Sequence, residues 1–534
     1  MTDDPSRRES ADPTMVYFRD TYFLFASKVG GYWWSDDLVN WNLVETNQIP
    51  VEDYAPTVVA IGDTLFFLAS NTTRCNIYKS TDPKKGSWKI ARDSFPITMT
   101  DPALFLDDDK RLYFYWGCSN KNPLYAVELD INNNFEPKGK PVETIMGNQG
   151  NNGWENPGDY NELTSKSPWI EGSWMNKIGS GYFLQYACPG TEFMSYSDGV
   201  YVSDNPLGPF KLQKHNPFSY KPGGFICGAG HGSTFTDRYG NLWHIATTVI
   251  SVNHMFERRL GLFPVFQDKD GIVYTWTGYG DYPFLIPEKK ITRPSDLSTG
   301  WSLLSYNKKI TASSALALCS PELACDENIK TFWSAGTETP GEWLESDMGK
   351  EYTVNALQIN FAESGSKVKG RTVDCYYQYK VEYSQDNTNW NTLTDKTFIK
   401  QDFSHDFIMP ETPVKARFIR LTCTHVPSGY FAVSDLRVFG SGNGSKPQDV
   451  KGFTAKRDNT DKRIVKLKWE RGNDITGYNI RYGTAKDKLY QNYMIYSDNE
   501  LIIRSLEANT RYFFTIEAFN ENGTGKSGKV TEVK

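Results

Sequence analysis

The chain has 534 residues, a formal net charge of −6, and 15 Trp, 31 Tyr and 31 Phe. At about 100 to 200 residues per domain, this length predicts three or four folding units. The aromatic content excludes a disordered or collagen-like chain. The acidic balance lacks the basic footprint of nucleic-acid binding, and no window approaches the ~18 apolar residues of a membrane span. We therefore expect no nucleic-acid partner and no membrane insertion.

Short aromatic segments repeat across the first half of the chain, each after a turn rich in Gly or Asp. Repeated short strands with turn punctuation, and without helical periodicity, predict an all-β propeller. Five repeats predict five blades, which we assign to residues 1–287. The aromatic segments are residues 22–27, 65–70, 112–116, 182–186 and 242–246.

A leader precedes each aromatic segment, and four leaders carry a polar residue of interest: Asp12, Asp101, Glu171 and His231. Singly, each is more often a turn residue or a solvated charge. The innermost strand of every propeller blade lines the central channel, so equivalent positions in successive repeats converge on one axis. Because the three carboxylates share a phase in the repeat, we expect them to meet His231 there.

Carboxylates in a shared pocket suit glycoside hydrolysis. One carboxylic acid protonates the leaving oxygen while a carboxylate on the opposite face deprotonates water. A third carboxylate nearby raises the pKa of the acid and keeps it protonated near neutral pH. The aromatic excess fits the same substrate, because sugar rings pack against flat aromatic side chains.

Residues 8–288 resemble the five-bladed propellers of glycoside hydrolase family 43. The resemblance rests on the motifs Ala11-Asp12-Pro13, Tyr54-Ala55-Pro56, Asp101-Pro102-Ala103, Ile170-Glu171-Gly172, Gly228-Ala229-Gly230-His231-Gly232 and Pro264-Val265. It implies an inverting mechanism without a required cofactor. Asp12 is then the general base, Glu171 the general acid, and Asp101 the residue that tunes and orients the acid.

The same resemblance implies further contacts to substrate. His231 would touch an ion or an ordered water, and Arg258, with Arg259 as the alternative, would hold the terminal sugar and the carboxylates. Tyr54 and Trp116 are the first candidates for sugar platforms. Tyr54 stands where the family commonly has Trp, and Ser173 follows Gly172 where the family has Pro, so the sugar specificity stays open.

We expect exo action on plant-type polysaccharide side chains, because the Gly/Asn-rich stretch 147–156 could wall one side of the pocket. The expected activity is that of an α-L-arabinofuranosidase. β-Xylosidase, exo-β-1,3-galactosidase and galactofuranosidase activities are the alternatives on the same scaffold. A glycan-binding protein that has lost catalysis is the non-enzyme alternative, and the presence of all three carboxylates speaks against it.

The second half predicts two β-sandwiches after a polar linker at 288–300. Residues 301–441 resemble the discoidin, or F5/8 type C, fold of family 32 carbohydrate-binding modules, which implies a structural calcium ion near Asp326, Thr331 and Asp435. Residues 442–534 resemble a fibronectin type III domain, with Tyr512 as a tyrosine corner and a spacer role. The N-terminal residues lack the apolar core of a secretory signal. By resemblance, we expect a secreted, periplasmic or cell-surface bacterial enzyme whose leader is absent from this chain.

Overall fold

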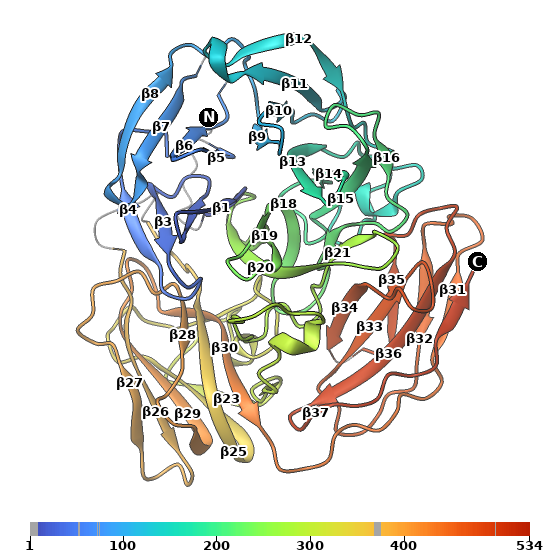
Figure 1. Cartoon of the computed structure of the whole chain (residues 1–534). Coiled ribbons are helices and arrows are strands. Elements are labelled where there is room, and N and C mark those ends of the chain that lie inside the picture. Colours follow the sequence, from blue (N-terminus) through green and yellow to red (C-terminus); the bar gives the residue numbers. More distant parts are fainter. Residues whose placement is uncertain (1–8, 52–53, 72, 74, 368–374, 497) are drawn as a thin grey trace.

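The computed structural model describes residues 9–51, 54–71, 73, 75–367, 375–496 and 498–534. Strands dominate these residues, so the predicted all-β class is confirmed. A propeller is followed by a central sandwich and a C-terminal sandwich, and both sandwiches lie on the same side of the propeller (Figure 1). Among the described residues, no helix combines the length and the hydrophobicity that crossing a membrane requires.

Five antiparallel sheets, each built from consecutive strands, surround one axis and confirm the five-bladed propeller (Figure 1). The first two blades contain β1 Thr14–Phe18, β2 Thr21–Phe25, β3 Gly31–Ser35, β4 Asn42–Glu45, β5 Thr57–Ile61, β6 Thr64–Leu68, β7 Ile77–Asp82 and β8 Ser87–Arg92. The third contains β9 Ala103–Leu106, β10 Leu112–Trp116, β11 Tyr125–Asp130 and β12 Glu136–Glu143. The fourth and fifth contain β13 Glu171–Ile178, β14 Gly181–Cys188, β15 Ser197–Ser203, β16 Lys211–Leu212, β17 Ser219–Tyr220, β18 Cys227–Thr236, β19 Leu242–Val249, β20 Arg258–Gln267 and β21 Val273–Thr275.

Aromatic side chains of the repeat hold neighbouring blades together. Phe25 stacks on Tyr32 with ring centroids 4.5 Å apart, and Phe67 from the next blade packs 5.7 Å from Phe25. The indole of Trp88 donates a hydrogen bond of 3.0 Å to the hydroxyl of Tyr32, which satisfies a polar atom inside this apolar cluster. Much of the aromatic excess therefore serves packing between blades.

The central sandwich has one large sheet and a buried core that includes Trp333, Phe361 and Tyr379. Its strands are β22 Ser302–Leu303, β23 Lys309–Ala312, β24 Trp333–Ser334, β25 Trp343–Phe361, β26 Gln378–Ser384, β27 Asn391–Asp395, β28 His405–Ile408, β29 Val414–His425 and β30 Ala432–Ser441. Short 3-10 helices of the chain are η1 Pro83–Lys85, η2 Ile131–Asn133, η3 Gly153–Glu155, η4 Pro294–Leu297 and η5 Pro321–Ala324.

The C-terminal sandwich packs a three-stranded sheet against a second sheet around Trp469 and Tyr482. The hydroxyl of Tyr512 accepts the backbone N–H of Glu507 at 3.1 Å, the upstream hydrogen bond expected of a tyrosine corner. Its strands are β31 Thr454–Arg457, β32 Val465–Lys468, β33 Gly477–Gly483, β34 Gln491–Tyr496, β35 Glu500–Ile503, β36 Tyr512–Asn520, β37 Gly523–Thr524 and β38 Thr531–Val533.

The linker predicted at 288–300 is not a free connector. Ile291 and Leu297 are buried in a cluster with Trp243 of the fifth blade. The side chain of Asn241 accepts the backbone N–H of Ile291 at 2.8 Å and donates to the carbonyl of Lys289 at 3.0 Å. The overall polar composition of this segment gave no sign that Ile291 and Leu297 would be buried against blade five.

A buried ion pair joins all three domains. Arg437 of the central sandwich donates two hydrogen bonds of 2.8 Å to Glu327, and a further nitrogen of Arg437 donates to the propeller carbonyl of Asp281. Tyr496 of the C-terminal sandwich donates to Glu327 at 2.9 Å. Arg437 and Glu327 are at most 1% exposed, so removal of one partner would leave a buried charge uncompensated.

The C-terminal sandwich also docks directly on blade five, and its expected spacer role stays a prediction. Tyr490 stacks on Tyr274 with centroids 3.6 Å apart and planes 1° from parallel. Its hydroxyl donates to Asp268 at 2.8 Å, and Lys488 forms an ion pair with the same carboxylate.

We expect Tyr490→Ala to loosen this docking, because it removes the stack and the hydrogen bond to Asp268. An aromatic pair contributes about 0.5–1.5 kcal/mol beyond its buried area. Proteases should cut faster within residues 442–453, while the junction of Arg437, Glu327 and Tyr496 keeps the radius of gyration from small-angle scattering unchanged. Tyr490→Phe, which keeps the stack, should lie between Tyr490→Ala and the wild type, and Tyr239→Ala on blade five is the control. Cleavage of Tyr490→Ala at the rate of the wild type would contradict a contribution of this stack to the docking.

Candidate active site

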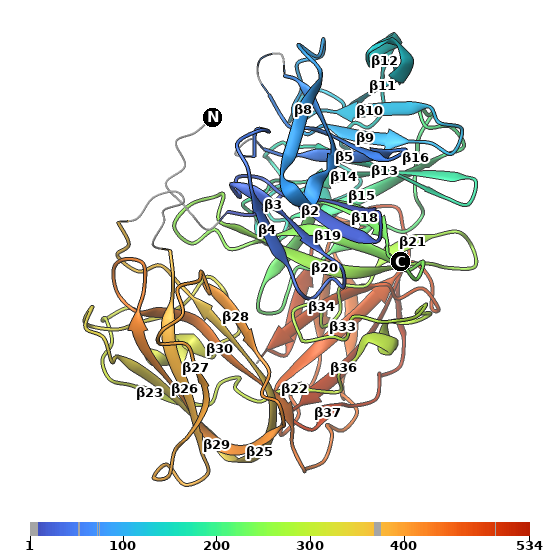
Figure 2. The same cartoon turned by 60° about the vertical axis from the view of Figure 1, so that its left-hand side comes forward.

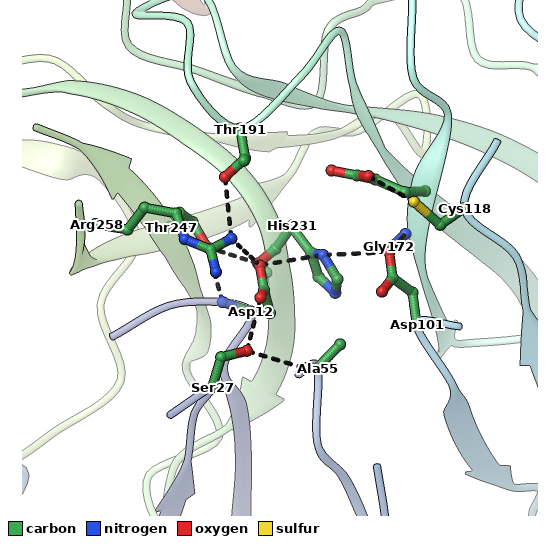
Figure 3. Close-up of polar contacts among 12 residues, drawn as sticks. Asp12, Ser27, Ala55, Asp101, Cys118, Gly172, Thr191, His231, Thr247 and Arg258 are labelled. Atoms are coloured by element: carbon green, nitrogen blue, oxygen red, sulfur yellow. Dashed lines mark hydrogen bonds and ion pairs between the residues drawn. The ribbon is translucent and has the colours of Figure 1, made fainter. Parts of the chain in front are cut away.

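The structure brings Asp12, Asp101, Glu171 and His231 together on the propeller axis. His231 lies between Asp12 and Asp101 (Figure 3), with its Nδ1 3.3 Å from Asp12 Oδ1 and 3.8 Å from Asp101 Oδ2. One potential ligand atom from each of Asp101, Glu171 and His231 lies within 4.8 Å of the others. Residues at equivalent positions of successive repeats thus lie together in the folded chain, as predicted.

A left-handed backbone residue recurs in every blade, two residues before the innermost strand in blades one to three and within that strand in blades four and five. The φ angles are 50° at Asp12, 47° at Ala55, 50° at Asp101, 60° at Gly172 and 39° at His231. Non-glycine residues seldom adopt this conformation and do so at a cost in free energy. Its recurrence, with three reactive-type side chains among the five, indicates that the backbone aims these positions at the axis.

Side chains of neighbouring blades accept hydrogen bonds from the backbone N–H groups of four of these left-handed residues. Asp12 donates to Thr247 Oγ1 at 2.8 Å, Asp101 to Ser70 Oγ at 2.9 Å, and His231 to Asp198 Oδ1 at 2.7 Å. Ala55 donates in the same way to Ser27 Oγ at 2.9 Å. The blades therefore lock one another's leaders in place.

Asp12 is poised to stay ionised. Its Oδ1 lies 3.0 Å from Arg258 Nη1, and its Oδ2 accepts the hydroxyl of Ser27 at 2.7 Å. Burial acts to raise the pKa of Asp12, but the charges of Arg258 and His231, together with these hydrogen bonds, lower it overall. A buried carboxylate held in its charged form is suited to accept a proton.

Arg258, and not its neighbour Arg259, reaches the cluster. Arg258 is 3% exposed and also donates to Glu9 Oε1 at 2.6 Å and to Thr191 Oγ1 at 3.0 Å. Arg259 donates to the backbone carbonyl of Arg258 at 2.8 Å and lines a cavity against the central sandwich. Because side chains alternate across a strand, only one of the two can face the channel.

Asp101 and Glu171 occupy different environments. Burial raises the pKa of Asp101 to about 7, assisted by the negative charges of Glu171 and Asp12 and opposed by His231. The Glu171 carboxylate accepts the hydroxyl of Tyr196 at 2.5 Å and the thiol of Cys118 at 3.0 Å. These two donors fix the direction in which Glu171 faces the axis.

His231 carries part of the compensating charge. Burial acts to lower the pKa of its imidazole, but Asp12, Asp101 and Glu171 raise it overall. Arg258, and His231 in its protonated form, place positive charge among three carboxyl groups, which limits the repulsion between those carboxyls.

The two predicted sugar platforms lie in different settings. The Tyr54 ring packs 5.8 Å from that of Phe256, and the Arg258 guanidinium lies over both rings. Tyr54 therefore borders the cluster through Arg258. Trp116 instead stacks with Phe114 at 5.1 Å and Tyr125 at 5.8 Å, within the apolar packing of blade three. Trp116 is partly buried by these contacts, and its role as a sugar platform stays a prediction.

The stretch 147–156 packs against the C-terminal sandwich, and the wall role expected of it stays a prediction. Its Gly153 N–H donates to the carbonyl of Leu506 at 2.9 Å, and Arg463 of the C-terminal sandwich donates to the carbonyl of Gln149 at 2.6 Å. Trp154 and Glu155 are fully buried. The Gly and Asn residues allow close backbone contact with the C-terminal sandwich, which a search for pocket walls could not show.

Sequence reasoning missed the residues that support the cluster: Glu9, Ser27, Ser70, Cys118, Thr191, Tyr196, Asp198 and Thr247. Ser27 and Ser70 did carry a signal, because both follow an Ala at the end of an aromatic segment, at the same phase of the repeat. Tyr196 and Cys118 carried none, since they lie on irregular segments whose direction depends on the assembled ring.

Comparison with known proteins identifies each domain. The family model "Glycosyl hydrolases family 43" matches residues 6–273. The model "F5/8 type C domain" matches residues 309–436, and the model "Fibronectin type III domain" matches residues 445–534. The three matches follow the order predicted from the motifs.

Individual relatives match parts of the chain. A β-xylosidase of Xylanibacter ruminicola is 26% identical over 155 residues, covering 25% of this chain and 42% of the relative. Mouse coagulation factor V is 32% identical over 122 residues, covering 22% of this chain and 5% of the relative. The matches thus span less than half the length of either relative. A solved structure named "Glycoside hydrolase" aligns with a TM-score of 0.48 and 16% identity, over 82% of this chain and 98% of that one.

The raised pKa of Asp101 predicts a pH-dependent stability difference for Asp101→Asn. A carboxyl with a folded-state pKa near 7 and an ordinary value of 3.8 loses its contribution to stability as pH rises through that window. The melting temperature of Asp101→Asn should therefore rise relative to the wild type between pH 4 and pH 8, by about 5 °C. Differential scanning calorimetry measures it.

Asp109→Asn is the control for this prediction. Hydrogen bonds from the backbone and side chain of Arg111 lower the pKa of Asp109, so this variant should not gain stability with rising pH. A difference between Asp101→Asn and the wild type that stays constant from pH 4 to pH 8 would rule out the raised pKa.

Proposed function

The chain belongs to family 43 of the glycosyl hydrolases, and we propose that it is an exo-acting, inverting glycosidase that removes terminal pentoses from polysaccharide side chains. This family hydrolyses glycosidic bonds with inversion at the anomeric carbon. The observation that carries the proposal is the ionised Asp12, bound by Arg258, in one cluster with Glu171 and Asp101.

In the proposed reaction, the Asp12 carboxylate takes a proton from water as the water oxygen attacks the anomeric carbon. Glu171 donates a proton to the departing glycosidic oxygen, so that the proton count balances across the step. Tyr196 and Cys118 position the Glu171 carboxyl for this transfer. Asp101, whose pKa is near 7, adjusts the charge around Glu171 through its own protonation.

Exo action on a terminal sugar is supported by the crowding around Asp12. The side chain is 5% exposed, and Arg258 with the Tyr54 and Phe256 rings occupies its surroundings. Such a neighbourhood suits the end of a glycan better than its middle. Product analysis on linear arabinan or xylan tests this point, because early release of long oligosaccharides would contradict it.

α-L-Arabinofuranose is the first candidate substrate, as expected from the sequence. β-D-Xylose is the second, and the similarity to a curated β-xylosidase favours it. Both are pentoses with the same requirement for a base, an acid and an orienting carboxyl. A panel of nitrophenyl glycosides of arabinofuranose, xylose, galactose and galactofuranose distinguishes them.

The acid assignment predicts that Glu171→Gln lowers kcat on a natural oligosaccharide by about 10²–10⁴-fold, since an amide cannot supply the proton. Asp12→Asn should lose activity by a similar factor through loss of the base. Proton NMR during turnover by the wild type should show the inverted anomer forming first. Activated aryl glycosides need little acid assistance, so the oligosaccharide decides the test.

Asp109→Asn, on an exposed turn of blade three, is the matched control and should keep full activity. Full oligosaccharide activity of Glu171→Gln, or a retained anomer as first product, would contradict the mechanism.

The accessory domains support a polymeric substrate. An F5/8 type C domain beside a glycosidase can hold a polysaccharide near the channel and raise its local concentration. We place the enzyme outside the cytoplasm, secreted, periplasmic or at the bacterial surface, because polymeric glycans are met there.

We also propose that the discoidin domain binds calcium near Asp326, Thr331 and Asp435. Thr331 donates to Asp326 Oδ2 at 2.7 Å, and Asp435 Oδ2 accepts the N–H of Glu327 at 3.0 Å. Asp435 Oδ1 is buried and has no hydrogen-bond partner among the described residues. Burial raises the pKa of Asp326 to about 6 and that of Asp435 above its ordinary value. Hard oxygen donors with uncompensated charge fit calcium.

Calcium binding predicts a higher melting temperature in 1 mM Ca²⁺ than in EDTA, because a ligand that binds only the folded state stabilises it. A concentration 100-fold above Kd contributes about 2.7 kcal/mol. Asp326→Asn should abolish the difference, while Asp395→Asn, an exposed change in the same domain, should keep it. Equal melting in Ca²⁺ and EDTA would refute the site.

An ion or ordered water at His231 is a further part of the proposal. The donor atoms of Asp101, Glu171 and His231 lie close enough to share one occupant. Because Asp101 and Glu171 also take part in catalysis in this proposal, water is the occupant that leaves both roles intact.

A further inference from the structure

An exposed tryptophan lies two residues before the proposed general acid. Trp169 is 44% exposed, whereas its neighbour Ile170 is 4% exposed and packs in the core between blades three and four. In this region, β13 of blade four lies beside β9 and β10 of blade three (Figure 2). A single exposed aromatic residue is common on protein surfaces, so the position of Trp169 relative to Glu171 decides whether it has a function.

Backbone hydrogen bonds hold Trp169 and Glu171 on one face of the chain. The N–H of Ile170 donates to the carbonyl of Ser119 at 3.0 Å, and the N–H of Ser119 donates back at 3.1 Å. On the other side, the N–H of Trp169 donates to the carbonyl of Pro189 at 2.8 Å. The segment is therefore extended between blade three and the end of β14. Successive side chains of an extended chain point to opposite faces, so the indole and the Glu171 carboxyl share the face opposite to Ile170.

The pairing with blade three extends to the residues on either side. Cys118 lies opposite Glu171, in agreement with the 3.0 Å hydrogen bond from its Sγ to Glu171 Oε2. Asn120, which is exposed, lies opposite Trp169. Trp169 and Asn120 thus lie about 7 Å further out along the face that carries the acid, because an extended chain rises about 3.3 Å per residue. This places the indole at the entrance to the channel.

The loop between β14 and β15 crosses the same entrance. Its Pro189 accepts the hydrogen bond from Trp169. Two residues later, Thr191 Oγ1 accepts a hydrogen bond from Arg258 Nη1 at 3.0 Å (Figure 3), and Arg258 in turn holds Asp12. The loop therefore runs from the surroundings of the acid to those of the base, and Trp169 borders it on the side of the acid.

Glu192 brings a carboxyl group to this loop, close to the acid. A Cβ atom at Gly190 would lie 2.9 Å from Glu192 Oε2, so the carboxyl group lies over the glycine. Burial raises the pKa of Glu192, and the negative charge of Glu171 adds to this rise. The acid side of the entrance thus combines an exposed indole, an amide and a carboxyl group.

The chemistry of the reaction gives this arrangement a use. The acid protonates the oxygen that joins the terminal sugar to the departing glycan. The first sugar of the departing glycan must therefore lie next to Glu171, on the side of the entrance. A sugar ring packs its C–H face against a flat aromatic ring, while polar groups beside the ring bind its hydroxyl groups.

We propose that Trp169, flanked by Asn120 and Glu192, binds the first sugar of the departing glycan. One face of this sugar stacks on the indole, and its hydroxyl groups form hydrogen bonds with the Asn120 amide and the Glu192 carboxyl group. The site selects for a saccharide as the leaving group. This inference rests on the proposed function, since it takes Glu171 as the acid, but sugar binding at Trp169 can be measured without hydrolysis.

The kinetic test compares xylobiose and arabinobiose with the matching xylosyl and arabinofuranosyl fluorides. Fluoride departs as an ion, so these substrates place no sugar on Trp169. We expect Trp169→Ala to lower kcat/KM for the disaccharide by about tenfold and to change it for the fluoride by less than about twofold. Trp169→Phe, which keeps an aromatic ring, should retain most of the activity on the disaccharide.

A purely structural role of Trp169 would lower kcat/KM for both substrates by the same factor. Tyr239→Ala is the matched control, because Tyr239 is 40% exposed in the turn between β18 and β19. It should act on both substrates like the wild type.

A binding test avoids hydrolysis. Isothermal titration calorimetry measures the affinity of the full-length Glu171→Gln protein for xylobiose and arabinobiose. Adding Trp169→Ala to this protein should raise the Kd of the bound disaccharide by about tenfold, and adding Tyr239→Ala should leave it unchanged.

The proposal is overturned if Trp169→Ala hydrolyses the disaccharide like the wild type, or if it loses the same factor on both substrates. Its failure is distinguishable from failure of the proposed function. Hydrolysis by the wild type without a selective loss in Trp169→Ala would refute the sugar site at Trp169 alone. Absence of hydrolysis by the wild type, with disaccharide binding that depends on Trp169, would refute the glycosidase activity alone. Absence of both hydrolysis and binding would refute both.

Discussion

The left-handed backbone residue just before or within the innermost strand of each blade is the constraint on which the rest of the site depends. At Asp12, Asp101 and His231 a side chain occupies a conformation that glycine tolerates best. Hydrogen bonds from the backbone of these residues to the side chains of Thr247, Ser70 and Asp198 in neighbouring blades maintain it. The local strain is therefore balanced by contacts between blades, and the site forms only when the ring is complete.

The electrostatic surroundings then give three similar carboxyl groups different protonation behaviour. Arg258 and Ser27 stabilise the charged form of Asp12, whereas burial beside Glu171 disfavours charge on Asp101. Hydrogen bonds from Tyr196 and Cys118 orient Glu171. The side-chain types alone do not assign roles, because an Asp in one blade and an Asp in another differ only by their neighbours.

The fold and the members of the cluster could be predicted from the sequence. In a propeller, residues at equivalent positions of successive repeats lie around the same central axis. Asp12, Asp101 and His231 could be found in this way, and Arg258 by its position before Pro264-Val265. The packing partners of Trp116 and of the stretch 147–156 could not be predicted, because the sequence does not show which segments meet in the folded chain. They are Phe114 and Tyr125 of blade three for Trp116, and the C-terminal sandwich for the stretch.

The ion pair of Arg437 with Glu327, joined by Tyr496 and the Asp281 carbonyl, has a consequence for how a polymer meets this enzyme. A binding module on a flexible linker samples many positions relative to the catalytic domain, and the avidity it adds falls gradually as the linker becomes longer. A module held at a buried junction instead keeps a fixed distance and a fixed orientation relative to the catalytic domain. With the polysaccharide binding proposed for the F5/8 type C domain, a glycan whose branch spacing matches that span would engage both domains together, and one that does not match would gain nothing from the second contact. Because the two domains are held rigidly, the spacing between branches of the glycan would decide which glycans bind to both of them.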